Sequence, residues 1–342
     1  MSLNKAFAAQ AQACIALDSP FMGQLMGILA RHWPSHTPFG HLCAQWPGDL
    51  SPKAVSLPLR IAGGLHALVL TGRDVDLAAL YPPNRVSDDA LKEGVLRSID
   101  THQDFLTEWV QSAPQTNEVR RSVALIAAAH WLATRHALPF VTSELGASAG
   151  LNLNWDRYAL EVGRQTLGPD NPALTLTPDW TGPIPSPAPV TVAQRGGIDL
   201  NPLDPTDPEQ TLRLLAYLWP DQPHRVTLTR AAISVQSTSV EQGDAIDWLE
   251  TRLAARHANH LHLIYHTIAW QYFPIATQAH GTALIQAAGS LATPSAPLAW
   301  LRMENDGGAD GAALTLRLWP GDQHVVLGRV DFHGRWVHWQ AM

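Results

Sequence analysis

Short apolar runs alternate with helix-like segments between about residue 139 and residue 303, and this alternation limits the possible folds more than any other feature of the sequence. The runs are PFVTSEL, VAQRGGIDL, ISVQSTSVEQ, LHLIYHTI and PLAWLRM, and turn-forming or polar residues separate them. Such runs are typical of strands in a parallel sheet, whose crossover helices bury both of its faces. The sequence therefore predicts an α/β domain with a mostly parallel sheet.

The segments between these strands have helix start and stop signals. In DPEQTLRLLAYLWP, Asp207 suits the N-cap, Pro208 the first helical position, and Pro220 lies beyond the end. We expect two further helices, over DAIDWLETRLAARH and over residues Ile275 to Ala288. The last runs, ALTLRLW, HVVLGRV and RWVHW, are joined by the turn-forming PGDQ and DFHG, so we expect antiparallel strands to close the sheet.

The first part of the chain has a different pattern. Apolar residues recur at three- and four-residue spacing over Phe21–Trp33, Leu57–Leu70 and Leu91–Val110, which predicts helices. We therefore predict an all-α N-terminal domain over residues 1–112 and an α/β domain over residues 113–342.

The α/β domain begins with a helix that starts at PQTNEV and ends near His136, and a proline-rich insertion interrupts it later. Residues 168–190 contain seven prolines, too many for a helix and badly placed for a central strand. We assign an ordered insertion to about residues 160–192. It explains why the predicted second strand lies so far along the chain from the first.

The overall composition excludes several classes of protein. A formal net charge of −7 and a pI near 6.1 disfavour a nucleic-acid partner, because such affinity comes mainly from clustered Lys and Arg. The two cysteines, Cys14 and Cys43, have no metal-ligand spacing and no secretory signal ahead of them, which favours a reducing cytoplasm. No apolar stretch reaches the roughly 18 residues that a membrane helix needs. We expect a cytoplasmic protein with a small-molecule substrate, no membrane segment and no bound metal.

The strongest chemical motif is ELGASAG, directly after the first predicted strand and before an expected helix. Gly146 and Gly150 would let the backbone approach a ligand, and the open helix end would supply N–H groups. The Glu144 carboxylate could orient a charged or hydroxylated cofactor. A plain glycine turn for tight packing between strand and helix is the alternative interpretation.

Two further acids follow the next predicted strands. Asp199 ends GGIDL, where a carboxylate could accept hydrogen bonds from both ribose hydroxyls of a nucleoside. Asp244 opens GDAIDWL and could lie near an adenine amino group or act as the N-cap of the following helix. Because the carboxyl ends of parallel strands share one edge of a sheet, these acids and the glycine loop together favour a nucleoside-bearing cofactor.

With these motifs, the sequence resembles class I S-adenosylmethionine-dependent methyltransferases, whose first motif is an acid-x-Gly-x-Gly-x-Gly strand-loop-helix and whose second and third strands end in acids. Ser148 replaces the middle glycine here. The resemblance implies a Rossmann-like, mostly parallel sheet with antiparallel C-terminal strands, preceded by the all-α domain. It also implies S-adenosylmethionine as the cofactor, S-adenosylhomocysteine as the product, and Ser148 in the cofactor loop.

Most of the chain is also similar to a bacterial domain-of-unknown-function family, family 2332, with a methyltransferase-like fold. The similar segments are PQTNEVRRS, ELGASAGLNLNWDRY, GIDLNPLDP, LRLLAYLWPDQ, HTIAWQYF and PLAWLRME. This resemblance implies the fold strongly and the activity only weakly, because a fold does not dictate a reaction.

The methyltransferase architecture suggests the remaining site residues. His266, with Gln271 and Tyr272, would lie at the end of a central strand beside the reactive methyl group, where His266 could act as a base. A hydrogen-bonded core histidine is the alternative. The start of the helix before the first strand would face the pocket and supply substrate-binding residues, or only caps and surface ion pairs; these residues are Gln115, Asn117, Glu118 and Arg121.

Three functions are compatible with these motifs. The first is a methyltransferase for a small molecule, which works mainly by holding the sulfonium and the acceptor in line. The second is a serine hydrolase, because GASAG also satisfies the G-x-S-x-G nucleophile elbow with Ser148 as nucleophile. The third is a non-catalytic protein that binds a nucleoside or cofactor.

Overall fold

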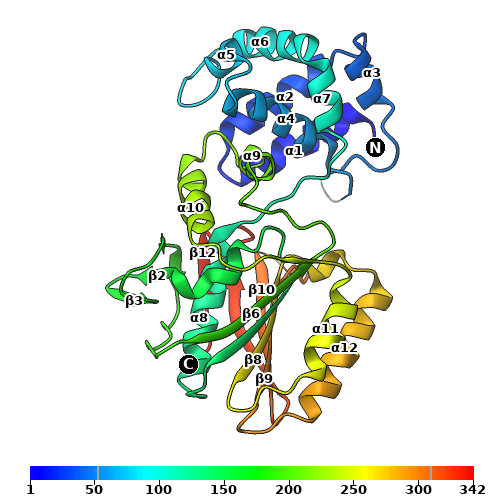
Figure 1. Cartoon of the computed structure of the whole chain (residues 1–342). Helices are drawn as coiled ribbons and strands as arrows, with labels where there is room; N and C mark the ends of the chain where they lie inside the picture. The colour runs from blue at the N-terminus through cyan, green and yellow to red at the C-terminus, as the bar shows by residue number, and fades with distance from the viewer. Residues whose placement is uncertain (52–53, 309) are drawn as a thin grey trace. The chain divides into compact units, whose positions relative to one another are not determined.

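The computed structural model describes residues 1–51, 54–308 and 310–342 (Figure 1). By its internal contacts the chain divides into two compact units. The helical unit comprises Met1–Thr116 and Thr206–Thr227, and the sheet unit comprises Asn117–Pro205 and Leu228–Met342. We predicted residues 113–342 as one continuous domain, whereas residues 206–227 pack with the helical unit.

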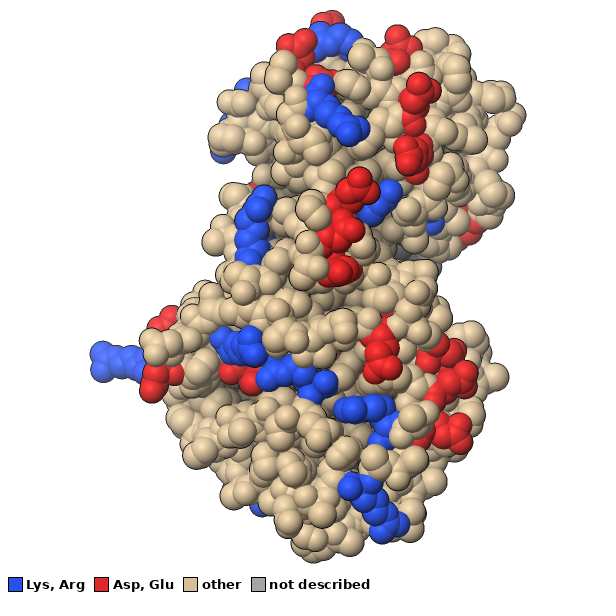
Figure 2. Space-filling model, in the orientation of Figure 1, with Lys and Arg blue, Asp and Glu red and all other residues tan. Residues whose placement is uncertain are grey.

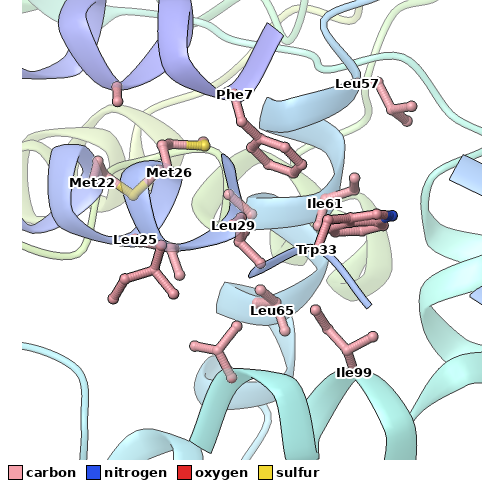
Figure 3. Close-up of a cluster of buried hydrophobic side chains, with 14 of the residues drawn as sticks. Phe7, Met22, Leu25, Met26, Leu29, Trp33, Leu57, Ile61, Leu65 and Ile99 are labelled. Carbon is pink, nitrogen blue, oxygen red and sulfur yellow. The ribbon is translucent and has the colours of Figure 1, made fainter. Parts of the chain in front are cut away.

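The helical unit is built around α4, which is buried along most of its length. Its helices are α1 (Leu3–Ala16), α2 (Pro20–His32), α3 (Pro38–Ala44), α4 (Leu57–Leu70), α5 (Val75–Ala78), α6 (Asp88–Thr101), α7 (Gln103–Trp109) and α9 (Pro208–Ala216). Phe7, Leu29, Ile61 and Leu65 meet in its core (Figure 3). The helices predicted at Phe21, Leu57 and Leu91 are confirmed, the last as two helices that meet at His102.

The N-cap of helix α9 is as predicted, but the position of the helix in the fold is not. The Asp207 carboxylate accepts hydrogen bonds from the Glu209 and Gln210 amides, as the N-cap prediction requires. We placed this helix beside the sheet, but it packs on α4. There the Tyr217 ring lies so close to Gly63 that a Cβ on the glycine would stand 2.5 Å from it.

The sheet unit contains a nine-stranded sheet in the order β5-β12-β11-β10-β9-β8-β1-β6-β7. Its strands are β1 (Phe140–Leu145), β5 (Asp179–Thr181), β6 (Val192–Asp199), β7 (Glu241–Gln242), β8 (Leu261–Thr267), β9 (Leu298–Glu304), β10 (Ala312–Trp319), β11 (Gln323–Val330) and β12 (Trp336–Trp339). The strands from β7 to β9 pair in parallel, and those from β9 to β12 pair antiparallel. The protein is thus a mixed α/β structure with a large, mostly parallel sheet and N-terminal helices.

Helices cover both faces of this sheet (Figure 1). Helices α11 (Ala245–Ala254) and α12 (Ile275–Ser290) pack on one face, and the entirely buried α8 (Ser122–Ala133) lies on the other. A 3-10 turn, η1 (Val119–Arg121), precedes α8. The proline-rich insertion is ordered: β2 (Ala159–Val162), β3 (Gln165–Leu167) and β4 (Thr175–Leu176) form a small sheet, and β5 joins the edge of the large one.

Two predicted elements differ in the structure. ISVQSTSVEQ is not one strand: α10 (Pro223–Ser234) includes its first residues, and only Glu241–Gln242 pair with β6. No α-helix follows the glycine loop, where the chain forms a 3-10 segment, η2 (Leu151–Arg157), with a non-helical Asn154. The Asn152 and Asn154 side chains bond to other segments and so hold this stretch in place.

Candidate functional site

The candidate site lies at the carboxyl end of β1, where the order of the strands reverses. The next long strand in the chain, β6, pairs with one side of β1, and β8 pairs with the other. Open α/β sheets bind ligands in the crevice outside the carboxyl ends of their strands at such a point. Glu144, Asp199 and Tyr265 stand at or near these strand ends.

The loop after β1 needs its glycines for backbone conformation and for close packing. Gly146 and Gly150 have φ values of 75° and 71°, in the left-handed region. A Cβ on Gly146 would stand 2.6 Å from the Cβ of Ala269, so the loop lies directly on the turn after β8. Ser148 adopts a left-handed φ of 53° and is buried.

The amides of this loop do not form the open set of donors that we expected from a helix end. Gly146 and Ala147 both donate to the Ile198 carbonyl at 3.0 Å, and Gly150 donates to the Ala147 carbonyl at 2.8 Å. The Ser148 amide donates to the Asp199 carboxylate at 2.9 Å. Because these donors are engaged within the protein, the loop offers a ligand shape and close approach instead of an anion-binding array.

Asp199 ties the neighbouring loops together. Its Oδ2 accepts from the Ser148 amide and its Oδ1 from the Asn201 amide, each at 2.9 Å. A carboxylate oxygen has two lone pairs, so each oxygen keeps one acceptor position beyond these bonds. The side chain is only half-buried. It can therefore receive two hydroxyl groups from a ligand.

Asp244 lies beside this loop but caps a helix. The Gly243 amide donates to the Asp199 carbonyl at 3.0 Å, which brings the two turns together. The Asp244 carboxylate accepts from the Ile246 and Asp247 amides at 2.8 and 3.2 Å. Its N-cap interpretation is thus confirmed.

Glu144 is buried beneath the loop, with 2% of its surface exposed. It pairs in register with Tyr265, whose hydroxyl group lies 3.4 Å from Glu144 Oε2 and 3.1 Å from the Asn152 carbonyl. Burial raises the pKa of Glu144 well above its ordinary value; the charge of Asp199 adds to the rise, and the Tyr265 hydroxyl and Arg121 oppose it. Burial therefore shifts this carboxyl group toward its neutral form.

Arg121 joins three parts of the sheet unit. Its Nε donates to the Phe332 carbonyl at 2.9 Å, and its Nη1 donates to the Thr267 carbonyl at 3.1 Å. Its charge also opposes the rise in the pKa of Glu144. The structure thus places this predicted residue near Glu144 and gives it bonds that hold the ends of two strands.

The other residues predicted around PQTNEV contribute mainly to the framework. The Asn117 side chain accepts from the Leu151 amide at 2.8 Å and so fixes the end of the glycine loop. Glu118 is buried and forms an ion pair with Arg120 at 3.1 Å. Gln115 falls on the helical side of the division at Thr116.

His266 is completely buried, and both of its ring nitrogens have partners. Its Nδ1 lies 2.6 Å from Glu304 Oε1, and its Nε2 accepts from the Trp300 indole at 3.0 Å, which assigns the proton to Nδ1. Burial lowers the pKa of His266, although Glu304 opposes the shift. The core-histidine interpretation therefore fits the geometry, and neither nitrogen is open to act as a base.

Strand geometry explains why His266 does not meet Glu144. Successive side chains of a strand point to opposite faces of the sheet. Tyr265 pairs with Glu144, so the next residue, His266, faces the α11 and α12 side, where its ring stacks on Trp270 at a centroid distance of 4.9 Å. The His266 and Glu144 side chains therefore lie on opposite faces of the sheet.

Gln271 and Tyr272 follow β8 on the turn that touches the glycine loop. The Gln271 side chain accepts from the Asn305 amide at 3.1 Å, and Tyr272 is 67% exposed. Sequence reasoning missed Tyr265 and Glu304. The alternation within LHLIYHT would have indicated that Tyr265 and His266 face opposite ways, but not which faces Glu144.

The residues that the structure describes form neither a metal site nor a helix able to span a membrane. Within residues 1–51, 54–308 and 310–342, no group of three or more His, Cys, Asp or Glu side chains is arranged to hold a metal ion. Among the described helices, none has the length and apolar character needed to span a membrane. On the face drawn in Figure 2, described Lys and Arg residues are scattered among Asp and Glu without a broad basic patch.

Comparisons with known proteins identify a family but no characterised relative. Neither the curated proteins nor the solved structures contain a significant match. The model of a family described as "Uncharacterized protein conserved in bacteria (DUF2332)" matches residues 4–339. This match includes nearly all of both units. The chain therefore belongs to this bacterial family.

Proposed function

We propose that this protein binds S-adenosylmethionine at the carboxyl end of β1 and transfers its methyl group to a small-molecule acceptor. The order of the parallel strands supports the proposal. Numbered along the chain, β7-β6-β1-β8-β9 is the order 3-2-1-4-5 found in doubly wound nucleotide-binding sheets. The antiparallel strands β10 to β12 extend this sheet, in keeping with a methyltransferase-like variant of the fold.

The position of Asp199 is the observation on which the proposal depends most. It ends the strand next to β1, and its two oxygens each keep an acceptor position after binding the loop amides. A ribose carries two adjacent hydroxyl groups that such a carboxylate can accept together. The Ser148 and Asn201 amides would hold the carboxylate in place for this contact.

The other residues fit the cofactor in part. Gly146 and Gly150 allow close approach of a ligand to the backbone, and Glu144 supplies a buried polar group below the loop. The engaged amides of Gly146 and Ala147 are not donors for the cofactor. When bound, S-adenosylmethionine supplies an electrophilic methyl group on a sulfonium. The protein would contribute orientation and exclusion of water, because His266 has no open nitrogen for a base.

One observation favours a serine hydrolase as a second candidate. Ser148 has the left-handed backbone that a nucleophile elbow demands. Against this function, His266 lies on the other face of the sheet and both of its ring nitrogens are engaged. Labelling of Ser148 by a fluorophosphonate probe, lost in Ser148→Ala, would select the hydrolase. Tight cofactor binding with no methylation in a broad acceptor screen would select the non-catalytic binding protein.

Isothermal titration with S-adenosylmethionine and S-adenosylhomocysteine tests the proposal. We expect micromolar binding by the wild-type protein and a loss of about tenfold or more in Asp199→Asn, equivalent to about 1.4 kcal/mol. Asp207→Asn is the matched control, because that carboxylate also accepts two backbone amides but lies in the helical unit. No binding at millimolar ligand, or equal affinity in Asp199→Asn, would contradict the proposal.

A further inference from the structure

The turn after β8 contains a strained residue at the edge of the candidate site. Ile268 has a φ of 55°, in the left-handed region that β-branched side chains avoid. Such a conformation persists only where the surrounding structure imposes it, and strained residues of this kind cluster at functional sites. The contacts that impose it here indicate what the strain achieves.

The Glu304 carboxylate accepts hydrogen bonds from the backbone amides of the turn after β8. Oε1 accepts from the Ala269 and Trp270 amides at 3.0 and 3.1 Å, and Oε2 accepts from the Gln271 amide at 3.3 Å. The Ile268 amide donates to the Met303 carbonyl at 2.8 Å. Met303 and Glu304, the last two residues of β9, therefore fix the four consecutive amides of residues 268–271.

His266 completes this arrangement. Its Nδ1 donates to the same Oε1 atom of Glu304 at 2.6 Å, and the Trp300 indole holds its other nitrogen. The Glu304 carboxylate is 7% exposed, and a buried carboxylate requires such donors to offset its lost hydration. Glu304, His266 and Trp300 thus form a hydrogen-bonded polar group within an apolar face of the sheet.

The turn held by Glu304 forms one wall of the glycine loop. Ala269 lies so close to Gly146 that no side chain fits between them. The Thr267 carbonyl, just before the strained residue, accepts from Arg121, whose charge also acts on Glu144. We propose that Glu304 is a positioning residue that holds the strained turn Thr267–Gln271 against the glycine loop. Where it concerns the ligand, this inference rests on the proposed cofactor binding.

Ile268→Gly separates positioning from simple structural support. Glycine adopts the left-handed conformation without the strain, which offsets the cost of its extra backbone freedom, so we expect a melting temperature close to that of the wild-type protein. Because glycine has more backbone freedom, the turn would also become less ordered. We therefore expect faster amide exchange at residues 269–271 and about tenfold weaker S-adenosylmethionine binding. Asn259→Gly is the matched control: it removes another left-handed side chain, with a φ of 60°, at the opposite end of β8.

Glu304→Gln gives a second, spectroscopic test. We expect loss of a far-downfield proton resonance from the short bond between His266 and Glu304, together with faster exchange at residues 269–271. Unchanged affinity in both variants, with wild-type binding intact, would overturn the positioning role and leave the proposed function standing. If the wild-type protein binds no S-adenosylmethionine, the proposed function fails, and the exchange rates decide the inference: wild-type rates in Glu304→Gln would overturn it.

Discussion

Two buried glutamates at the carboxyl edge of the sheet have pKa values shifted in opposite directions although they are similarly buried. Glu144 is 2% exposed and Glu304 is 7% exposed. Burial raises the pKa of Glu144 well above its ordinary value. The pKa of Glu304 is lowered, although burial acts to raise it, because hydrogen bonds from His266 and from the turn amides favour the ionised form.

The number of donors explains this difference. Glu144 receives one hydroxyl contact, at 3.4 Å, from a tyrosine that also reaches a backbone carbonyl. Glu304 receives three backbone amides and an imidazole N–H. Burial penalises any charge, and only directed hydrogen bonds to the ionised form reverse that penalty. A buried acid can therefore be assigned a role only after its donors are known.

Glu304→Ala should produce the largest effect. It leaves three backbone amides and the His266 ring without their acceptor in a buried region. We expect a loss of about 3–5 kcal/mol in the free energy of unfolding, measured by urea titration. A loss below about 1 kcal/mol would mean that water replaces the carboxylate, and the contrast with Glu144 would then not depend on donors.

The pH dependence of stability should have opposite signs at the two sites. The raised pKa of Glu144 makes its contribution to stability complete below its ordinary value of 4.5, and this contribution is lost as the pH rises through the folded-state value. Glutamine does not ionise. We therefore expect Glu144→Gln to gain stability relative to the wild-type protein as the pH rises above 4.5, in urea titrations at a series of pH values.

Glu304→Gln provides the comparison in the same titrations. The lowered pKa of Glu304 makes its contribution complete above 4.5 and removes it as the pH falls through the folded-state value. The deficit of this variant should therefore shrink below pH 4.5. Parallel curves for either variant and the wild-type protein would show that the carboxyl group in question has the same pKa in the folded and unfolded states.

Much of the fold was predictable because its signals are local. Strand β1 and the N-cap Asp207 follow from flanking prolines, apolar runs and capping residues, and both are confirmed. The position of α9 was not predictable, because it depends on a glycine far away in the sequence, Gly63, that makes room for Tyr217. Local residues specify where a helix or strand forms, whereas the element against which it packs depends on shape complementarity between distant segments.

The candidate site, too, was predictable only where its signals are local. ELGASAG predicts a tight turn, and the left-handed glycines confirm it. The partners of its amides, Ile198 and Asp199, come from β6 and lie beyond the insertion. The side of the sheet that His266 faces depends on the register between β1 and β8, which pattern alone does not specify.

Asp244→Ala should produce the smallest effect and extends the comparison to an exposed carboxylate. Asp244 accepts two backbone amides at the start of α11, and N-cap residues contribute about 1 kcal/mol. We expect a loss of that size in urea titrations, with unchanged S-adenosylmethionine affinity and recovery of stability in Asp244→Ser, which keeps a capping oxygen. If affinity falls in both variants, Asp244 contacts the cofactor as well as the helix. A much smaller loss per accepted hydrogen bond here than in Glu304→Ala would show that the bond between a carboxylate and backbone amides stabilises the protein more when water cannot replace it.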